Sequence, residues 1–136
     1  MMPAVLTIAG SDSSCGAGVQ ADLKTFQRLG AYGLCAVTAV TAQDGLRVDG
    51  IWPLPPSAIA AQARAALRAR RVAAVKTGML WGPGTIRAVA RLLEGARVRL
   101  LVVDPVLATH GGDPLAAPGA AEAMARFLFP LATLVT

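Results

Sequence analysis

The sequence has 136 residues, of which 54% are hydrophobic and 15% charged, and its formal net charge is +5. This composition excludes a disordered tail, because the chain is apolar enough to form a core, and the length predicts one domain. No run of about 18 apolar residues is present, which excludes a membrane-spanning helix. The first residues lack the features of a signal peptide, so we expect a soluble cytoplasmic protein with Cys15 and Cys35 as free thiols.

Positive charge is concentrated in the middle of the chain, where Glu94 is the only acid between residues 64 and 99. Such a band could attract nucleic acid, but the arginines follow two predicted helices without interleaved aromatic residues. We therefore favour solvated helix faces over a nucleic-acid interface. The basic residues of this segment are Lys76 and the arginines at positions 64, 68, 70, 71, 87, 91, 97 and 99.

The first half of the chain alternates between strand and helix patterns. Residues 4–9 form an apolar run that predicts a buried strand. Apolar residues then recur at helical spacing from Gly18, and Gly30 is placed to end that helix. Residues 35–42 have hardly a polar side chain except threonines, which predicts a central strand covered on both faces, and a short strand is expected near 48–54.

The second half continues the alternation. Two prolines at 55 and 56 open a predicted helix that runs to about Arg70, since proline is tolerated in a first helical turn. Strands are expected at 73–77 and 100–104, and helices at 85–93 and 120–128, with a glycine-rich loop before the last helix. The apolar run 131–136 has no turn, cap or polar residue after it, so we interpret it as a strand within which the chain is cut.

This succession predicts an α/β fold with a mostly parallel sheet and helices on both faces. Ligands bind such sheets at the carboxyl ends of the strands. The chemically distinctive residues follow predicted strands, so four separate segments are expected to converge on one edge. These segments are Gly10-Ser11-Asp12, Gln43-Asp44, Gly78-Met79 and Asp104-Pro105.

The loop 10–18 is rich in small residues, which allow its backbone to approach a ligand, and amide groups at the helix start could hold an anion or a polar ring. The alternative is a flexible loop with capping serines. Residues 16–21 also match the G-x-G-x-x-G/A dinucleotide fingerprint. We disfavour that interpretation, because the glycines come late after the strand and no acid follows the motif at about 20 residues.

Two polar side chains are candidates for binding a ligand. Asp22 shares the inward helix face with Val19 and Phe26, where a carboxylate is costly unless it is paired. It is either a satisfied structural residue or an acceptor for a ligand hydroxyl or ring amine. Gln43 ends an apolar strand and offers one donor group and one acceptor oxygen, which suits a heterocycle edge, unless it is simply exposed in a loop.

Other side chains carry weaker signals. Met79 would line a pocket for a flat ring or belong to the core. His110 lies in the sequence His110-Gly111-Gly112-Asp113-Pro114, which we interpret as a mobile flap, and no second histidine supports a metal site. Cys15 could be a nucleophile at a helix start, but no histidine lies near it in sequence to activate it, so we disfavour covalent catalysis.

Taken together, these segments resemble the hydroxymethylpyrimidine/phosphomethylpyrimidine kinases of thiamine biosynthesis, which belong to the ribokinase-like superfamily. The order and spacing of the segments agree along the whole chain. The resemblance is carried by residues 6–14, 16–26, 38–43, 75–80, 103–106 and 130–133.

The resemblance implies transfer of the terminal phosphate of ATP to a hydroxymethyl group or to a phosphate already attached there, with ATP and Mg²⁺ as cofactors. It implies that Asp22 and Gln43 bond to the pyrimidine while Met79 packs against the ring, and Asp104 is the candidate magnesium ligand. The implied substrate-binding residues are Gly10, Ala17, Asp22, Gln43, Met79 and Val106.

Two features depart from the family pattern. Cys15 stands where the family usually has a second glycine, and family members are about twice as long as these 136 residues. The resemblance places the ATP site and the catalytic cysteine in the part that is absent. We therefore expect residues 1–136 to be an N-terminal substrate-binding part with no catalytic residue of its own and little kinase activity.

Two alternatives stay open. One is a pyridoxal or pyridoxamine kinase of the same superfamily. The other is a non-catalytic pyrimidine-binding module, completed by a homodimer contact or by another chain that pairs with the apolar strand at 131–136.

Overall fold

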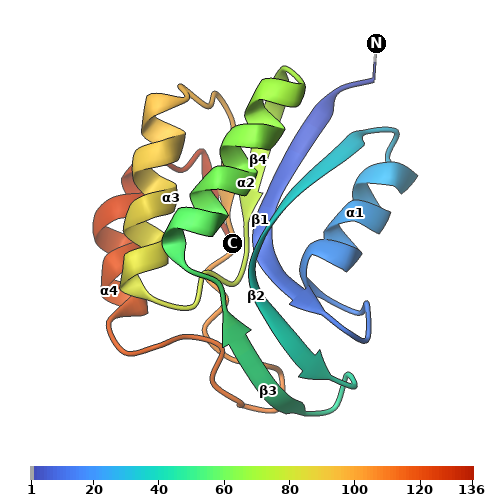
Figure 1. Cartoon of the computed structure of the whole chain (residues 1–136), viewed down its shortest axis with the longest axis vertical. Helices are drawn as coiled ribbons and strands as arrows, with labels where there is room; N and C mark the ends of the chain where they lie inside the picture. The colour runs from blue at the N-terminus through green and yellow to red at the C-terminus, as the bar shows by residue number, and fades with distance from the viewer. Residues whose placement is uncertain (1) are drawn as a thin grey trace.

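A computed structural model describes residues 2–136 of the chain (Figure 1). The first half forms β1 (Ala4–Asp12), α1 (Gly18–Arg28), β2 (Tyr32–Gln43), β3 (Val48–Pro53) and α2 (Pro56–Ala69). The second half forms β4 (Val72–Thr77), α3 (Pro83–Gly95), β5 (Leu101–Val103), α4 (Ala120–Ala123) and β6 (Leu134–Val135). A π-helical turn (Met124–Leu128) and a 3-10 turn (Phe129–Leu131) connect α4 to β6.

The strands form one six-stranded sheet in the order β3-β2-β1-β4-β5-β6. Every neighbouring pair is parallel except β2 and β3, which form an antiparallel hairpin at one edge. The predicted mostly parallel sheet is therefore confirmed. Its central strands run the same way, so the loops after β1, β4 and β5 emerge at one end of the sheet.

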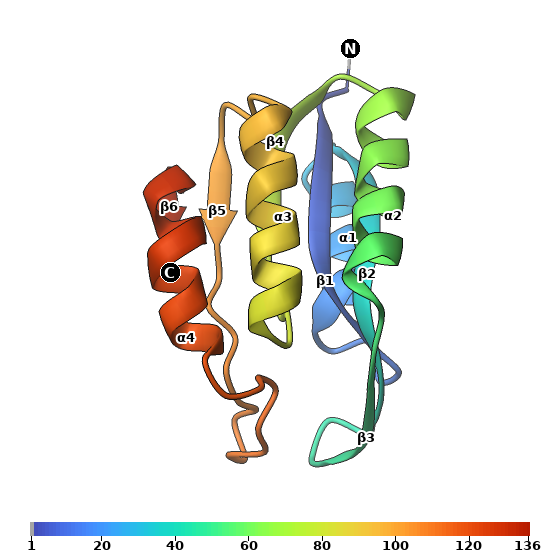
Figure 2. The same ribbon diagram turned by 60° about the vertical axis from the view of Figure 1, so that its left-hand side comes forward.

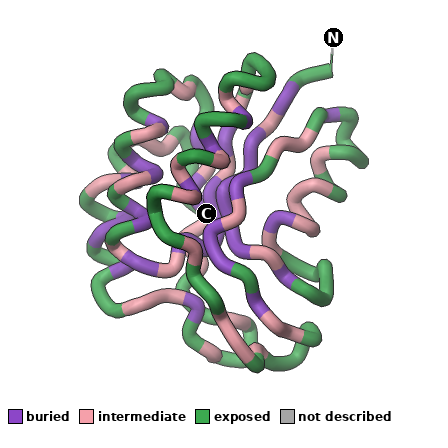
Figure 3. The backbone as a smooth tube through the Cα atoms, viewed as in Figure 1, coloured by how far each residue is buried: buried purple, intermediate pink, exposed green. Residues whose placement is uncertain are grey.

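Helices cover both faces of the sheet, as predicted (Figure 2). Strand β1 alternates between the two layers: Leu6 and Ile8 are fully buried in the core with Ile59 of α2 and Ile86 of α3. Thr7 faces the opposite layer, where its hydroxyl donates a hydrogen bond to Asp22 of α1. The buried residues accordingly gather along the central strands and the inner faces of the helices (Figure 3).

Helix α1 ends as its sequence predicts. Gly30 has φ +73°, its N–H donates to Gln27 O, and the N–H of Ala31 donates to Phe26 O. These two bonds satisfy carbonyl oxygens that the helix end would otherwise leave free. The left-handed backbone at position 30 favours glycine.

Strand β2 is longer than predicted, and its faces are less completely buried than predicted. It begins at Tyr32, earlier than expected, because Tyr32 pairs in register with Ala4. It is not covered along both faces, since Cys35 and Val40 are exposed. Threonine and small apolar residues fit either environment, so the sequence pattern could not distinguish them.

The C-terminal region is less regular than predicted. In place of one helix over 120–128, α4 passes into the π-helical turn and then the 3-10 turn. Pro130 has no N–H with which to continue a helix, so the chain leaves the helical path there. Of the expected strand at 131–136, only Leu134–Val135 pairs with β5.

None of the helices described between residues 2 and 136 has the length and apolar character that crossing a bilayer requires. Both cysteines are free, as predicted from the sequence, and both are exposed.

Candidate functional site

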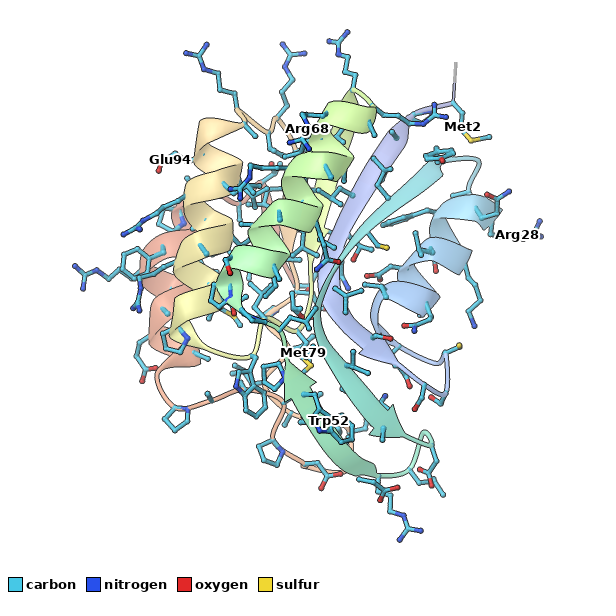
Figure 4. All side chains as sticks on the ribbon, viewed as in Figure 1. Met2, Arg28, Trp52, Arg68, Met79 and Glu94 are labelled. Atoms are coloured by element: carbon cyan, nitrogen blue, oxygen red, sulfur yellow. The ribbon has the colours of Figure 1, made fainter. Side chains whose placement is uncertain are left out.

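The predicted site residues lie around one cavity at the carboxyl ends of the central strands. The cavity has a volume of about 240 Å³. Met79, which lies directly after β4, marks this end of the sheet in Figure 4. The convergence expected from topology is therefore observed: Gly10, Ala17, Asp22, Gln43, Met79, Asp104 and Val106 all line this cavity.

Asp12 holds the loop between β1 and α1 in place. Its buried carboxylate accepts hydrogen bonds from Ser14 N at 2.7 Å, Ser14 Oγ at 2.8 Å and Ala17 N at 2.7 Å. Burial opposes ionisation of this carboxyl, but the bonds from Ser14 and from the backbone of Ala17 and Gly16 together lower the pKa of Asp12 below 3.8. The carboxylate of Asp12 thus ties together the backbone of the loop.

Two glycines allow the loop to approach the strands closely. Gly18 has φ +60°, and a Cβ there would lie 2.4 Å from Gly10 O. A Cβ on Gly10 would lie 2.9 Å from Met79 Sδ. Gly18 therefore lets α1 begin against the end of β1, and Gly10 leaves room for the thioether at the cavity wall.

Cys15 adopts a conformation that usually belongs to glycine. Its φ is +58°, and its N–H donates to Asp12 O at 3.0 Å to close the turn. Cys15 thus closes the turn at the cost of a left-handed backbone. It is exposed within the loop and does not line the cavity.

Asp22 forms an ion pair with Lys76 and also lines the cavity. Its carboxylate accepts a hydrogen bond from Thr7 Oγ1, and Lys76 Nζ lies 3.1 Å from Oδ1 and 3.0 Å from Oδ2. The side chains of Asp22 and Lys76 are only 17% and 22% exposed. Both readings of Asp22 from the sequence therefore have support: the carboxylate is satisfied within the protein, and it also borders the cavity.

Lys76 bridges two carboxylates at the cavity wall. Besides its contacts with Asp22, its Nζ lies 3.8 Å from Asp104 Oδ2. The absence of a side chain on Gly78 makes space for it, since a Cβ there would lie 3.0 Å from Lys76 Nζ. Two carboxylates and one ammonium give this wall a formal charge of −1.

Gln43 presents its amide to the same cavity. Its backbone is fixed by Ser13, whose Oγ donates to Gln43 O at 2.7 Å and accepts from Gln43 N at 2.9 Å. Thr41 Oγ1 lies 3.0 Å from both Gln43 Oε1 and Ser11 O, and its single hydroxyl proton is shared between these two acceptors. The Gln43 carbonyl thus keeps acceptor capacity, and within residues 2–136 no hydrogen bond from its amide nitrogen is seen.

The apolar wall is formed by Met79, Val106 and Leu115. Met79 packs with Leu115 in a small cluster that Val106 borders, and Thr38 Oγ1 donates to Met79 O at 2.6 Å. A polarizable thioether between a glycine and aliphatic side chains suits the face of an aromatic ring.

A second cavity of about 370 Å³ adjoins the first and shares Asp12, Ala17 and Gln43 with it. His110 lines this second cavity from an exposed loop. Asp113 ties that loop to the β2–β3 hairpin, because its Oδ2 accepts from Val48 N at 3.3 Å.

The turn of that hairpin is closed by Asp44. Hydrogen bonds from the backbone N–H groups of Leu46 and Arg47 lower the pKa of the exposed Asp44 carboxyl below 3.8.

The candidate magnesium ligand, Asp104, lines the cavity beside Lys76. Within residues 2–136, no group of three or more histidine, cysteine, aspartate or glutamate side chains is placed to hold a metal ion. The charged partner of Asp104 is the ammonium of Lys76. That Asp104 helps to bind Mg²⁺ stays a prediction.

Sequence reasoning did not single out Lys76 or Thr41. Lys76 lies within an otherwise largely apolar strand pattern, and a lone lysine there is more often a solvated residue. The sequence did offer a signal for this ion pair. A half-buried lysine requires a carboxylate partner, and Asp22 was an inward acid to which no partner had been assigned.

Comparison with known proteins decides the family. The sequence profile described as phosphomethylpyrimidine kinase matches residues 12–136. The chain belongs to the phosphomethylpyrimidine kinase family. The resemblance inferred from the sequence is therefore confirmed.

Curated relatives agree with this assignment. The chain is 48% identical over 134 residues to a hydroxymethylpyrimidine/phosphomethylpyrimidine kinase of Streptomyces coelicolor, with 98% of this chain and 49% of the relative covered. It is 50% identical over 132 residues to the thiamine biosynthesis bifunctional protein ThiED of Geobacter sulfurreducens, with 97% and 27% covered. The chain thus spans about half the length, or less, of the curated relatives it matches.

Solved structures show the same ribokinase-like fold. The phosphomethylpyrimidine kinase of Clostridium difficile superposes with a TM-score of 0.91 at 41% identity, covering 98% of this chain and 58% of that one. The pyridoxal kinase of Staphylococcus aureus in complex with AMP-PCP and pyridoxal has a TM-score of 0.84 at 42% identity, covering 99% and 48%. The predicted fold is therefore confirmed.

Proposed function

We propose that this chain binds the substrate of a hydroxymethylpyrimidine/phosphomethylpyrimidine kinase and is the N-terminal, substrate-binding part of that single kinase domain. The observation that carries this proposal is the lining of the cavity: Gln43 of β2, Asp22 of α1 and Met79 of the loop after β4 line one space. They offer an amide, a carboxylate and a thioether to the same ligand. Such a set recognises a small, flat heterocycle that carries donor and acceptor groups.

The size of the cavity favours a ligand with one ring. Pockets for larger ligands span about 300–1,000 Å³, and this one has about 240 Å³. A nicotinamide or flavin cofactor is disfavoured by the position of the glycines in residues 16–21 and not by this volume, since a second cavity of about 370 Å³ adjoins the first.

Each lining group has a chemical role in this proposal. Gln43 donates through its amide nitrogen and accepts through its oxygen, which matches a ring nitrogen next to an exocyclic amine. Met79 packs against the ring face, in the space that Gly10 leaves open. Asp22, kept in position by Lys76 and Thr7, accepts a hydrogen bond from the amine or the hydroxymethyl group.

The reaction proposed for the whole enzyme is phosphoryl transfer from ATP. The hydroxymethyl oxygen forms a bond to the terminal phosphorus, the bond from that phosphorus to ADP breaks, and the hydroxyl proton passes to a base. We assign the base and the phosphate-binding groups to the part of the relatives that this chain does not span. Phosphoryl transfer depends on such groups, so we expect little turnover from the 136-residue chain alone. Mg²⁺ and a cytoplasmic location are part of the same proposal.

A pyridoxal kinase is the second candidate, and a specific observation favours it. Structures of a pyridoxal kinase with pyridoxal bound superpose on 99% of this chain at 42% identity. Pyridoxal is also a single ring with a hydroxymethyl arm. Pyridoxal carries a carbonyl and a phenolic oxygen in place of the exocyclic amine of the pyrimidine. The Gln43 side-chain amide would therefore face acceptor atoms on pyridoxal where the pyrimidine offers a donor.

A binding module without catalysis is the third candidate. The edge strand β6 exposes Leu134 and Val135 by 55% and 40%, and its free side could pair with another chain or a second copy. Sedimentation of the purified chain tests this version: a dimer that dissociates when β6 is altered supports it, and a monomer counts against it.

Ligand-dependent thermal unfolding tests the main proposal. We expect 4-amino-5-hydroxymethyl-2-methylpyrimidine to raise the melting temperature more than pyridoxal does, and Gln43→Ala to abolish the rise. Gln27→Ala is the matched control, because Gln27 is exposed on α1 away from the cavity. A larger rise in melting temperature with pyridoxal would favour the second candidate. Equal rises for Gln43→Ala and Gln27→Ala would contradict the proposed role of Gln43 in binding the ligand.

A further inference from the structure

A second feature of the molecule lies at the opposite end of the sheet from the cavity. The C-terminal ends of α2 and α3 and the segments that lead into β4 and β5 surround a hollow of about 760 Å³. Figure 4 shows long basic side chains at this end, near Arg68, far from Met79. We call this hollow the arginine basin; its arginines are Arg64, Arg68, Arg70, Arg71, Arg91, Arg97 and Arg99.

The positive charge of the basin is not neutralised within the described chain. Among residues 2–136, the only arginine in an ion pair is Arg47, which lies elsewhere. The one acid of the region, Glu94, lines a different hollow with Arg87, Arg126 and Arg91, and of these arginines only Arg91 also lines the basin. No acidic side chain lines the basin. Its guanidinium groups therefore repel one another, and an anion bound among them would relieve that repulsion.

One of these arginines, Arg70, is held in a defined position. Its guanidinium lies 3.9 Å from the centre of the Tyr32 ring, a stacking contact that leaves its N–H edge free to bond. Arginine near a helix C terminus also stabilises the helix dipole, which accounts for Arg68 of α2. This effect on the helix dipole does not explain why the segments that lead into β4 and β5 also contribute arginines to the basin.

We propose that the arginine basin binds a short oligophosphate, independently of the function proposed for the cavity. The planar guanidinium presents paired N–H groups that match phosphate oxygens. Besides the arginines, the lining is formed by leucine, valine, alanine and glycine. No amide or carboxylate side chain lines the basin to recognise a nucleobase edge or an amine, and the neighbouring Tyr32 ring is stacked against Arg70. The ligand is thus recognised by several closely spaced phosphate charges, and a hollow suits a short chain better than a duplex.

Isothermal titration with tripolyphosphate tests this proposal in the 136-residue chain. The test variant is Arg68→Gln/Arg71→Gln/Arg99→Gln. The control is Arg28→Gln/Arg87→Gln/Arg126→Gln, which removes the same charge from residues outside the basin. All six side chains are exposed, so both variants are expected to fold, and circular dichroism checks this.

We expect the basin variant to weaken tripolyphosphate binding by about tenfold or more and the control by less than about twofold, at an ionic strength of about 0.15 M. Orthophosphate should bind much more weakly than tripolyphosphate. Equal losses in both variants would overturn the proposal, because they indicate attraction by net charge alone. Tighter binding of a polyglutamate peptide or a DNA duplex, or no binding of tripolyphosphate, would also overturn it.

Discussion

The ion pair between Asp22 and Lys76 should contribute measurably to stability. The charged atoms are 3.0 Å apart, and the two side chains are 17% and 22% exposed. Breaking a fully buried pair costs about 3–5 kcal/mol, whereas fully exposed pairs contribute about 0–1 kcal/mol. Because this pair is mostly but not wholly shielded, we expect Lys76→Met to lower the free energy of unfolding by about 2 kcal/mol.

A double-mutant cycle isolates the contribution of the pair. Urea unfolding is measured for Lys76→Met, for Asp22→Asn and for both together, and a coupling energy of about 1–3 kcal/mol is expected. The exposed pair of Arg47 and Asp49, 3.9 Å apart, is the control and should show no measurable coupling. A coupling below about 0.5 kcal/mol for Asp22 and Lys76 would refute the reasoning.

Three further substitutions test the loop after β1. Gly18→Ala should lower the free energy of unfolding by about 2–4 kcal/mol, since its Cβ would lie 2.4 Å from Gly10 O at a strained backbone. Cys15→Gly should raise it by about 1 kcal/mol by relieving φ +58°. Asp12→Asn should destabilise the protein at neutral pH. The pKa of Asp12 is lowered on folding, so its contribution is complete above 3.8 and is lost as pH falls through the folded value.

Urea unfolding serves all three substitutions. Gly30→Ala is the control for Gly18: it has the same sign of φ but no atom within 4 Å of its Cβ, so it should cost only about 1–2 kcal/mol. Equal losses at the two glycines would contradict a steric cause. A less stable Cys15→Gly protein would show that the cysteine makes favourable contacts. If the Asp12→Asn deficit did not shrink at low pH, the carboxylate would not be the group that fixes the loop.

The sheet could be predicted because alternation of strand and helix leaves few topologies. Parallel strands need a crossover connection, and each predicted helix lies between two strands. The end of α1 followed from Gly30 alone, since glycine tolerates a positive φ. The antiparallel direction of β3 was not predicted. A short apolar segment does not show whether the strand that it forms is parallel or antiparallel to the neighbouring strand.

The site could be predicted only in part. Topology placed Gln43 and Met79 at one edge of the sheet, but it gave no partner for Asp22. The structure supplies one because Thr7 of β1 and Lys76 of β4 are register neighbours on the face that α1 covers. That pairing joins residues 54 positions apart, and no local pattern records it.

The arginine basin shows the same difference between sequence and structure. The sequence displayed arginines along two helices, which is typical of solvated faces. The structure brings arginines from α2, α3 and the two connections around one hollow without an acid in its lining. Side chains from separate segments gather only when the chain folds, so composition alone could not distinguish a scattered from a clustered arrangement.

We expect the cavity between Asp22 and Gln43 to hold a pyrimidine ring against Met79. The most direct measurement is a nuclear Overhauser effect between the Met79 methyl group and the ring proton of 4-amino-5-hydroxymethyl-2-methylpyrimidine in a methyl-labelled chain. We predict a cross-peak for Met79 and none for Met124, which is buried among the helices. Binding with no cross-peak to Met79, or with shifts confined to the far end of the sheet, would contradict the account.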